Sequence, residues 1–223
     1  MLPRYEKQLS DLQEMISALI KTTFHASEIT LEGYQRQDDE LFLRAISSLK
    51  AIQTDANAID NEIIKTFALF GPEAHELREL VAYLKMTNEI VRIAEGIKKY
   101  ARRMKEHCKG ECDLSPVNRT IIQLHNSTLT ALQLISECFS SLENCEIEDF
   151  YRKVMVEESK NDDLFAILEK EILDQVIKET ELASEYVRIL GTLRKLERSC
   201  DRSVNIANLM LYAKQGGQMR VYS

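Results

Sequence analysis

The 223-residue chain contains no tryptophan, only three prolines and only seven glycines. So few prolines and glycines leave few positions at which a helix is forced to end. Aromatic residues make up 7% of the chain, which is sparse for an all-β core. No apolar run approaches the roughly 20 residues that span a bilayer, and the N-terminus, MLPRYEKQLSDLQEM, lacks the apolar core of a signal peptide. We therefore expect a cytoplasmic chain of long helices with no direct membrane span.

An excess of acidic over basic residues gives the chain a formal net charge of −7. An acidic chain repels nucleic acid, and no continuous basic stripe offsets this charge, so we expect no nucleic-acid partner. The densest basic segment is interrupted by an uncharged pair, and it reads either as a solvated helix face or as a small anionic docking patch. Its basic residues are Lys98, Lys99, Arg102, Arg103 and Lys105.

Five cysteines are present, and in a cytoplasmic protein all of them are expected to be reduced thiols. The odd count also argues against a complete disulfide framework. Cys108-x-x-x-Cys112 beside His107 could suggest zinc, but this is not the spacing of a zinc finger, and no second cysteine pair follows. We therefore favour free thiols at these two positions.

Apolar residues recur at three- and four-residue steps along most of the chain, which predicts amphipathic helices. The pattern breaks at residues 35–39, 108–116, 144–148 and 178–181, at Gly71-Pro72 and at Gly216-Gly217. A second helix is predicted to run without interruption from Leu41 to Phe67, and a third from Pro72 to His107. The chain thus predicts an all-α fold of two tandem three-helix bundles, residues 1–107 and 117–223, joined by a linker at 108–116.

The two halves form an internal repeat of roughly a hundred residues, weak in identity but consistent in order. In the alignment of the two halves, Arg92 corresponds to Arg198 and Glu95 to Asp201, and Asp60 corresponds to Asp162 in the middle helix of each half.

Residues 196–207, LERSCDRSVNIA, resemble the L-E-R-I-G-D-H-A-x-N-I-A motif of the PhoU family. The family's other mark is an acidic E/D-x-x-x-D pair on the middle helix, and Glu158-x-x-x-Asp162 fits it. In the first half, AID at 58–60, Pro72 and ELR at 76–78 follow the family's order of elements. The resemblance covers nearly the whole chain and implies two three-helix repeats.

The resemblance implies a metal site made by two acidic pairs on neighbouring helices, Glu158 with Asp162 and Glu197 with Asp201. Carboxylates four residues apart share one helix face and repel unless a cation or a proton neutralises them. Oxygen-only ligands favour Mg²⁺, Mn²⁺, Fe or Ca²⁺.

In the first repeat, Ala56 and Val91 replace two of the four acids, which leaves Asp60 and Glu95 as weaker candidates. The alternative is that the acids of both repeats are solvated or salt-bridged, with Arg198 and Arg202 as neighbours in the second.

PhoU-like proteins link the phosphate ABC transporter, including its ATPase, to a sensor histidine kinase. They keep the phosphate-starvation response off when phosphate is plentiful, and they often form homodimers. The resemblance therefore implies a regulator that acts by protein–protein interaction and is not an enzyme. A helical scaffold or adaptor of unrelated role is the alternative. A di-iron oxidase is excluded because the chain contains no Glu-x-x-His, and no Gly-rich phosphate loop is present.

Overall fold

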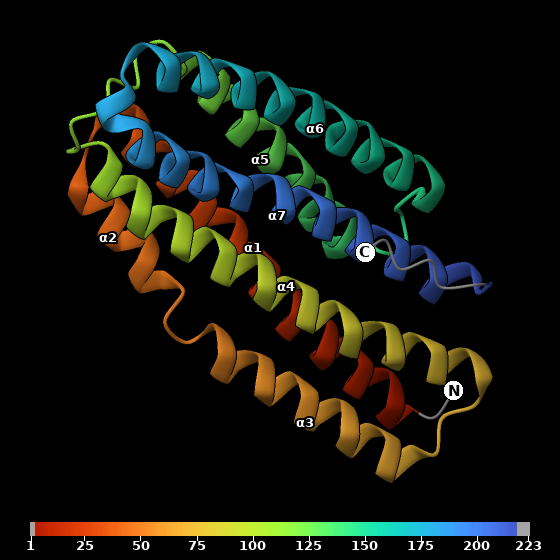
Figure 1. Cartoon of the computed structure of the whole chain (residues 1–223). Coiled ribbons are helices and arrows are strands. Elements are labelled where there is room, and N and C mark those ends of the chain that lie inside the picture. The colour runs from red at the N-terminus through yellow and green to blue at the C-terminus, as the bar shows by residue number, and fades with distance from the viewer. Residues whose placement is uncertain (1–2, 218–223) are drawn as a thin grey trace.

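The computed structural model describes residues 3–217 as an all-helical protein, with no strand in that range (Figure 1). The sequence prediction of the fold class is confirmed. The elements are α1 (Pro3–Arg36), α2 (Asp39–Ser48), α3 (Ile52–Phe70), α4 (Ala74–His107), α5 (Asn118–Ser140), α6 (Ile147–Lys178), the short 3₁₀ helix η1 (Thr180–Leu182) and α7 (Ala183–Gln215).

The helices form two groups, α1–α4 and α5–α7, which lie side by side along their length (Figure 1). Helix α4 packs against α7 and α1 packs against α5, so the equivalent first and last helices of the two halves meet. Glu89 of α4 contacts Arg202 of α7, whereas His107 contacts Glu185, and this order shows that α4 and α7 run antiparallel. No helix in the described part of the chain is long and apolar enough to cross a membrane.

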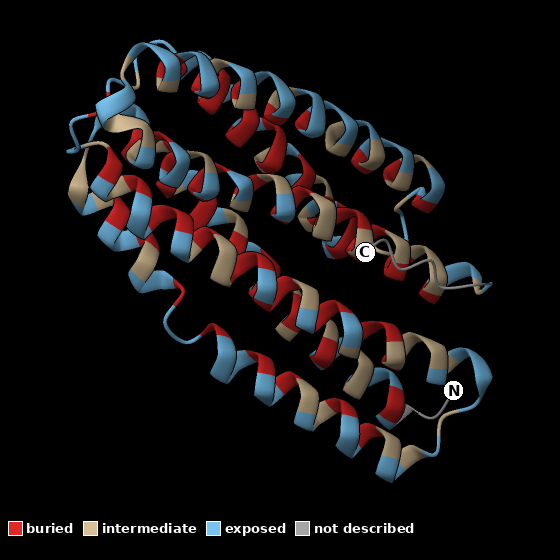
Figure 2. Cartoon of the chain, viewed as in Figure 1, coloured by how far each residue is buried: buried red, intermediate tan, exposed pale blue. Residues whose placement is uncertain are grey.

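Buried residues line the inner faces of the helices (Figure 2). The buried hydrophobic residues form two cores. One core joins residues of α1, α3 and the first part of α4 with the end of α5, the start of α6 and the end of α7. The other joins Phe42 and Tyr100 with Ile121, Phe165 and Tyr186. Each core therefore takes side chains from both halves of the chain.

Most helix ends lie where glycine, proline or a capping residue in the sequence predicts them. Gly71 has φ +52° and ends α3, a conformation that glycine adopts without a Cβ clash. The following helix begins with a capping box, in which Glu73 and Glu76 each accept a hydrogen bond from the other's backbone N–H. Helix α7 ends at Gln215, immediately before Gly216-Gly217.

The prediction of one continuous second helix from Leu41 to Phe67 is wrong, because residues 49–51 separate α2 from α3. No glycine or proline marks this break. Its cause is tertiary: Phe42 of α2 packs into one core, while Leu49 and Ile52 pack into the other. The Ser48 hydroxyl donates a hydrogen bond to the Ala45 carbonyl at 2.8 Å and so satisfies part of the last turn of α2.

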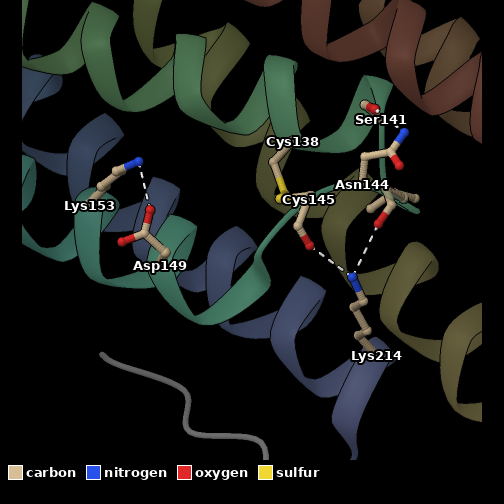
Figure 3. The surroundings of a disulfide bond; sticks show 8 residues. Cys138, Ser141, Asn144, Cys145, Asp149, Lys153 and Lys214 are labelled. Carbon is tan, nitrogen blue, oxygen red and sulfur yellow. Dashed lines mark hydrogen bonds and ion pairs between the residues drawn. A yellow bond between two sulfur atoms is a disulfide. The ribbon is translucent and has the colours of Figure 1, made fainter.

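The prediction that all five cysteines are reduced is also wrong, because Cys138 and Cys145 form a disulfide (Figure 3). Helix α5 ends two residues after Cys138, and the turn into α6 returns the chain so that the two Cα atoms lie 5.2 Å apart, within the range that a disulfide bridges. Lys214 Nζ of α7 donates to the carbonyls of Leu142 and Cys145 at 3.3 and 2.8 Å, so α7 is attached to the same turn. Cys108, Cys112 and Cys200 are free thiols.

Candidate metal centre

Three of the four predicted second-repeat ligands come together between α6 and α7. One carboxylate oxygen from each of Glu158, Asp162 and Asp201 lies within 4.8 Å of the others. Within residues 3–217 this is the one group of three or more acidic, histidine or cysteine side chains with such spacing. An oxygen-only set of this kind fits a hard or borderline cation.

An asparagine on the neighbouring face of α6 helps to hold this helix in the orientation that presents these acids. Asn161 is fully buried, and its Nδ2 donates to the Leu124 carbonyl at 3.0 Å and to Thr128 Oγ1 at 3.1 Å, both on α5. Glu158 and Asp162 lie about 60° and 100° from Asn161 in the same direction around α6, so they face the flank that meets α7 while Asn161 faces α5.

Glu197, the fourth predicted ligand, lies next to this group without joining it. Its Oε2 is buried and has no hydrogen-bond donor, and the same is true of Asn205 Oδ1, two turns further along α7. Buried oxygens without donors are unusual in folded proteins. The unpaired oxygen of Glu197, which lies near Asp201 and Asp162, fits a cation at the edge of the cluster.

The acids raise one another's pKa values. Burial is the largest cause of the raised pKa of Glu158, followed by the charges of Asp162 and Asp201. The pKa of Asp201 is raised by burial and then by Asp162, against the opposing charges of Arg202 and Arg198. Burial and then Asp201 raise the pKa of Glu197, and burial and then Asp163 raise that of Asp162. The site is therefore short of positive charge, which a bound cation would supply.

The alternative that arginines neutralise these acids has little support in the structure. None of Glu158, Asp162, Glu197 and Asp201 forms an ion pair in the described part of the chain. Arg202 instead pairs with Glu89 of α4 at 2.8 Å.

The first repeat does not assemble an equivalent cluster. Ala56 and Val91 are buried apolar residues, and Glu95 forms an ion pair with Lys98 at 3.2 Å. Asp60 keeps one buried oxygen without a partner, and burial raises the pKa of its carboxyl. Asp60 and the Lys98-paired Glu95 are thus the two acids left at the positions where the second repeat has four.

His107 and the linker cysteines do not form a zinc site. His107 Nδ1 contacts Glu185 Oε1 at 2.8 Å, and its Nε2 contacts Thr192 Oγ1 at 3.0 Å. Both ring nitrogens therefore connect the end of α4 to α7. Cys108 and Cys112 remain free thiols, as predicted, and burial is the main cause of their raised pKa values.

The fold and the site together define a tandem-repeat helical protein with an acidic cluster in its second repeat. A family model described as the PhoU domain matches residues 16–104 and again residues 121–210. The two matches cover most of the chain, which therefore belongs to the PhoU family.

Curated relatives are similar over most of their length. The chain is 26% identical over 215 residues to the "Phosphate-specific transport system accessory protein PhoU homolog" of Xylella fastidiosa, covering 96% of this chain and 88% of that protein. It is 24% identical over 190 residues to the "Phosphate-specific transport system accessory protein PhoU" of Escherichia coli, covering 85% and 76%. The crystal structure of PhoU from Pseudomonas aeruginosa superposes with a TM-score of 0.87 at 20% identity, over 96% of this chain and 100% of that one, which shows a shared fold.

Proposed function

We propose that this protein regulates phosphate uptake and the phosphate-starvation response as a cytoplasmic, non-enzymatic partner of a phosphate ABC transporter. The observation that carries the proposal is the PhoU-domain match in both halves of the chain, supported by relatives named as accessory proteins of phosphate-specific transport. The transporter ATPase and a sensor histidine kinase are the proposed partners. The mechanism is binding and a change of partner, without covalent chemistry.

Deletion in the native host tests this proposal. At high phosphate, the deletion should switch on phosphate-responsive transcription, and the wild-type chain supplied from a plasmid should switch it off again. Co-purification with the transporter ATPase and the kinase tests the partners separately. Transcription that stays unchanged in the deletion strain would remove the regulatory role.

We further propose that Glu158, Asp162, Glu197 and Asp201 hold a divalent or ferric cation. When bound, the cation supplies the positive charge that these carboxylates lack. Without it the acids of α6 and α7 repel each other, so a bound cation would strengthen a contact that the hydrophobic core already makes. The second repeat should bind better than the first because it presents more carboxylates.

Elemental analysis of a charge-removing variant tests the site. Glu197→Gln with Asp201→Asn keeps size and helix but removes two charges, so we expect less bound Fe, Mn, Mg or Ca without unfolding. The matched control is Asp11→Asn with Glu14→Gln, which removes two exposed acids of α1 that form no ion pair in the described structure. Equal metal in the site variant and the parent would show that the assignment is wrong.

We also propose a homodimer, on the resemblance alone. Light scattering should then give about twice the chain mass of 25.7 kDa. The monomer mass across a broad range of concentrations would exclude the dimer.

A further inference from the structure

Five basic side chains gather where the two halves of the protein meet, on the solvent side of the contact between α4 and α7. We call this group the cationic seam. It includes two residues of the basic segment noted in the sequence and adds three that lie elsewhere in the chain. Its members are Arg92, Lys99 and Arg103 of α4 and Lys195 and Arg198 of α7.

The alignment of the two helices places these residues together. Gly96 of α4 lies so close to α7 that a Cβ added there would be 3.3 Å from Ser199 Oγ and 3.9 Å from the Lys195 carbonyl. At about 100° per residue, Arg92, Lys99 and Arg103 lie within about 60° of Gly96 on the same side of α4. The three basic residues of α4 therefore extend over about 16 Å of that helix, and the two of α7 extend over about 4.5 Å beside them.

Acids lie near one member of the seam, because the charge of Arg198 opposes the raised pKa values of Glu197 and Asp201. Arg194, Arg188 and Lys98 each pair with an acid, whereas none of the five seam residues forms an ion pair within residues 3–217. The nearby acid Glu89 is already paired with Arg202 at 2.8 Å. In a chain of net charge −7, a group of cations without ion pairs needs an explanation.

Placing these cations together opposes stability. Lys195 is half-buried, and its pKa is lowered by burial and then by the charges of Arg103, Lys99 and Arg198. Like charges at this spacing repel each other. An anionic group bound along the seam would relieve the repulsion, so the arrangement favours a negatively charged occupant.

The position of the cations favours a narrow occupant over a flat one. The outermost line of α4, opposite its buried face, also carries Glu95 and Glu106, about 80–100° from Gly96. A bilayer would rest on that outermost line and meet these acids as well. The seam cations Arg92, Lys99 and Arg103 lie nearer to α7, so an occupant that follows the boundary between the two helices meets them without meeting these acids. The net negative charge also opposes long-range approach to anionic membranes or nucleic acid.

We propose that the cationic seam is a docking surface for an acidic helical segment of a partner protein. Carboxylates at three- and four-residue spacing along one face of a helix would meet the cations of α4 and α7. Arginine and lysine together suit this role, because guanidinium groups bind carboxylates through two hydrogen bonds and ammonium groups add charge. The inference stands on charge placement and does not depend on the proposed role in phosphate regulation.

The test uses a fluorescein-labelled synthetic helix that carries glutamate at every third or fourth position of one face. Fluorescence anisotropy measures its binding to the full chain in low salt, with the same peptide carrying glutamine as the uncharged comparison. The seam variant carries Lys99→Glu, Arg103→Glu and Lys195→Glu together, and it should bind the peptide at least about tenfold more weakly. Each lost ion pair at the upper end of the range for surface pairs accounts for about a three- to fivefold change in the dissociation constant. The matched control, Lys21→Glu, Arg44→Glu and Lys178→Glu, reverses three exposed cations away from the seam.

A loss confined to the seam variant, with binding that weakens as salt is raised, supports the proposal. Equal losses in the seam and control variants would show an effect of net charge alone and overturn it. Stronger binding of anionic vesicles or duplex DNA than of the acidic helix would also overturn it, as would seam-dependent self-association detected by light scattering. The Lys99→Gln, Arg103→Gln and Lys195→Gln variant, verified by circular dichroism, separates loss of binding from loss of fold. The two proposals fail independently, because this assay contains no component of phosphate signalling.

Discussion

His125 allows a direct test of how the buried interior responds to acid. Its imidazole is fully buried on α5, where Nε2 contacts Ser27 Oγ of α1 at 3.0 Å and the ring meets Tyr100 of α4 edge-on at 5.2 Å. The Nδ1 atom is buried and has no hydrogen-bond partner. Burial lowers the pKa of His125 to about 3, against a smaller opposing effect of the hydrogen bond with Ser27. The folded protein thus holds this histidine neutral.

The sign of the effect follows from proton linkage. An unfolded histidine titrates near pH 6.5, so below that pH the unfolded chain binds a proton that the folded chain rejects. Stability is therefore full above about pH 6.5 and falls toward the folded pKa of about 3, by about 1.4 kcal/mol for each pH unit. Between pH 7 and pH 5, His125 should lower the free energy of unfolding by about 2 kcal/mol.

Urea denaturation at pH 7 and pH 5 measures this difference. The reference is His125→Gln, which cannot titrate and should lose about 2 kcal/mol less than the parent over the same interval. The matched control is His25→Gln, at an exposed histidine that pairs with Glu28, and it should keep the pH dependence of the parent. Equal pH dependence in the parent and His125→Gln would refute the reasoning, whatever the stability of the variant at pH 7.

Three further predictions test other parts of the structure. Reduction with dithiothreitol should expose two more thiols and lower stability by about 2–3 kcal/mol, as measured by thiol titration and melting temperature; the Cys138→Ser/Cys145→Ser variant should not respond to the reductant. Gly191→Ala should stabilise α7 by about 0.5–1 kcal/mol because nothing lies within 4 Å of the added Cβ. Gly96→Ala should give no such stabilisation, because its added Cβ would crowd Ser199 of α7. Equal stabilisation of the two variants in urea denaturation would contradict the close packing of α4 against α7 at Gly96. Asp60→Asn should leave the metal content unchanged in elemental analysis, since positions 56 and 91 are apolar and Glu95 is paired with Lys98; a large loss of metal would point to a first-repeat site.

Periodicity alone predicted the helices and most of their ends. Gly71, Pro72 and the Gly216-Gly217 pair act locally, through the conformations their backbones allow, so sequence is sufficient to place them. The break at residues 49–51 has no such local signal. It arises because neighbouring segments pack into different cores, and a single-chain pattern does not contain that information.

The disulfide shows a second kind of feature that could not be predicted from the sequence. The expectation of reduced thiols was based on the cellular compartment, which says nothing about distance. Cys138 and Cys145 are close because the turn after α5 folds back on itself, and the exact path of that turn could not be predicted from spacing.

The structure brings three of the four proposed metal ligands together, and their binding of a metal stays a prediction. The spacing of Glu158 with Asp162 placed both on one face of a helix, and the structure brings them to Asp201. Glu197 lies beside the group because the rotation of α7 is set by its packing against α4 and α6. Asn205, which is part of the family motif in the sequence, has a buried side-chain oxygen without a hydrogen-bond partner, and no signal in the sequence predicted this.

The two cores that each draw on both halves have a consequence for symmetry. Equivalent helices meet across the junction, α1 with α5 and α4 with α7, and the second pair runs antiparallel. This is the arrangement that a two-fold axis produces when two copies of one unit associate through the same surface. A single repeat made on its own would expose the core residues that normally contact the other repeat. A second copy of the same repeat would have the surface that covers them. The full chain is thus a dimer of repeats whose subunits are joined by one covalent connection, and it should unfold as one cooperative unit.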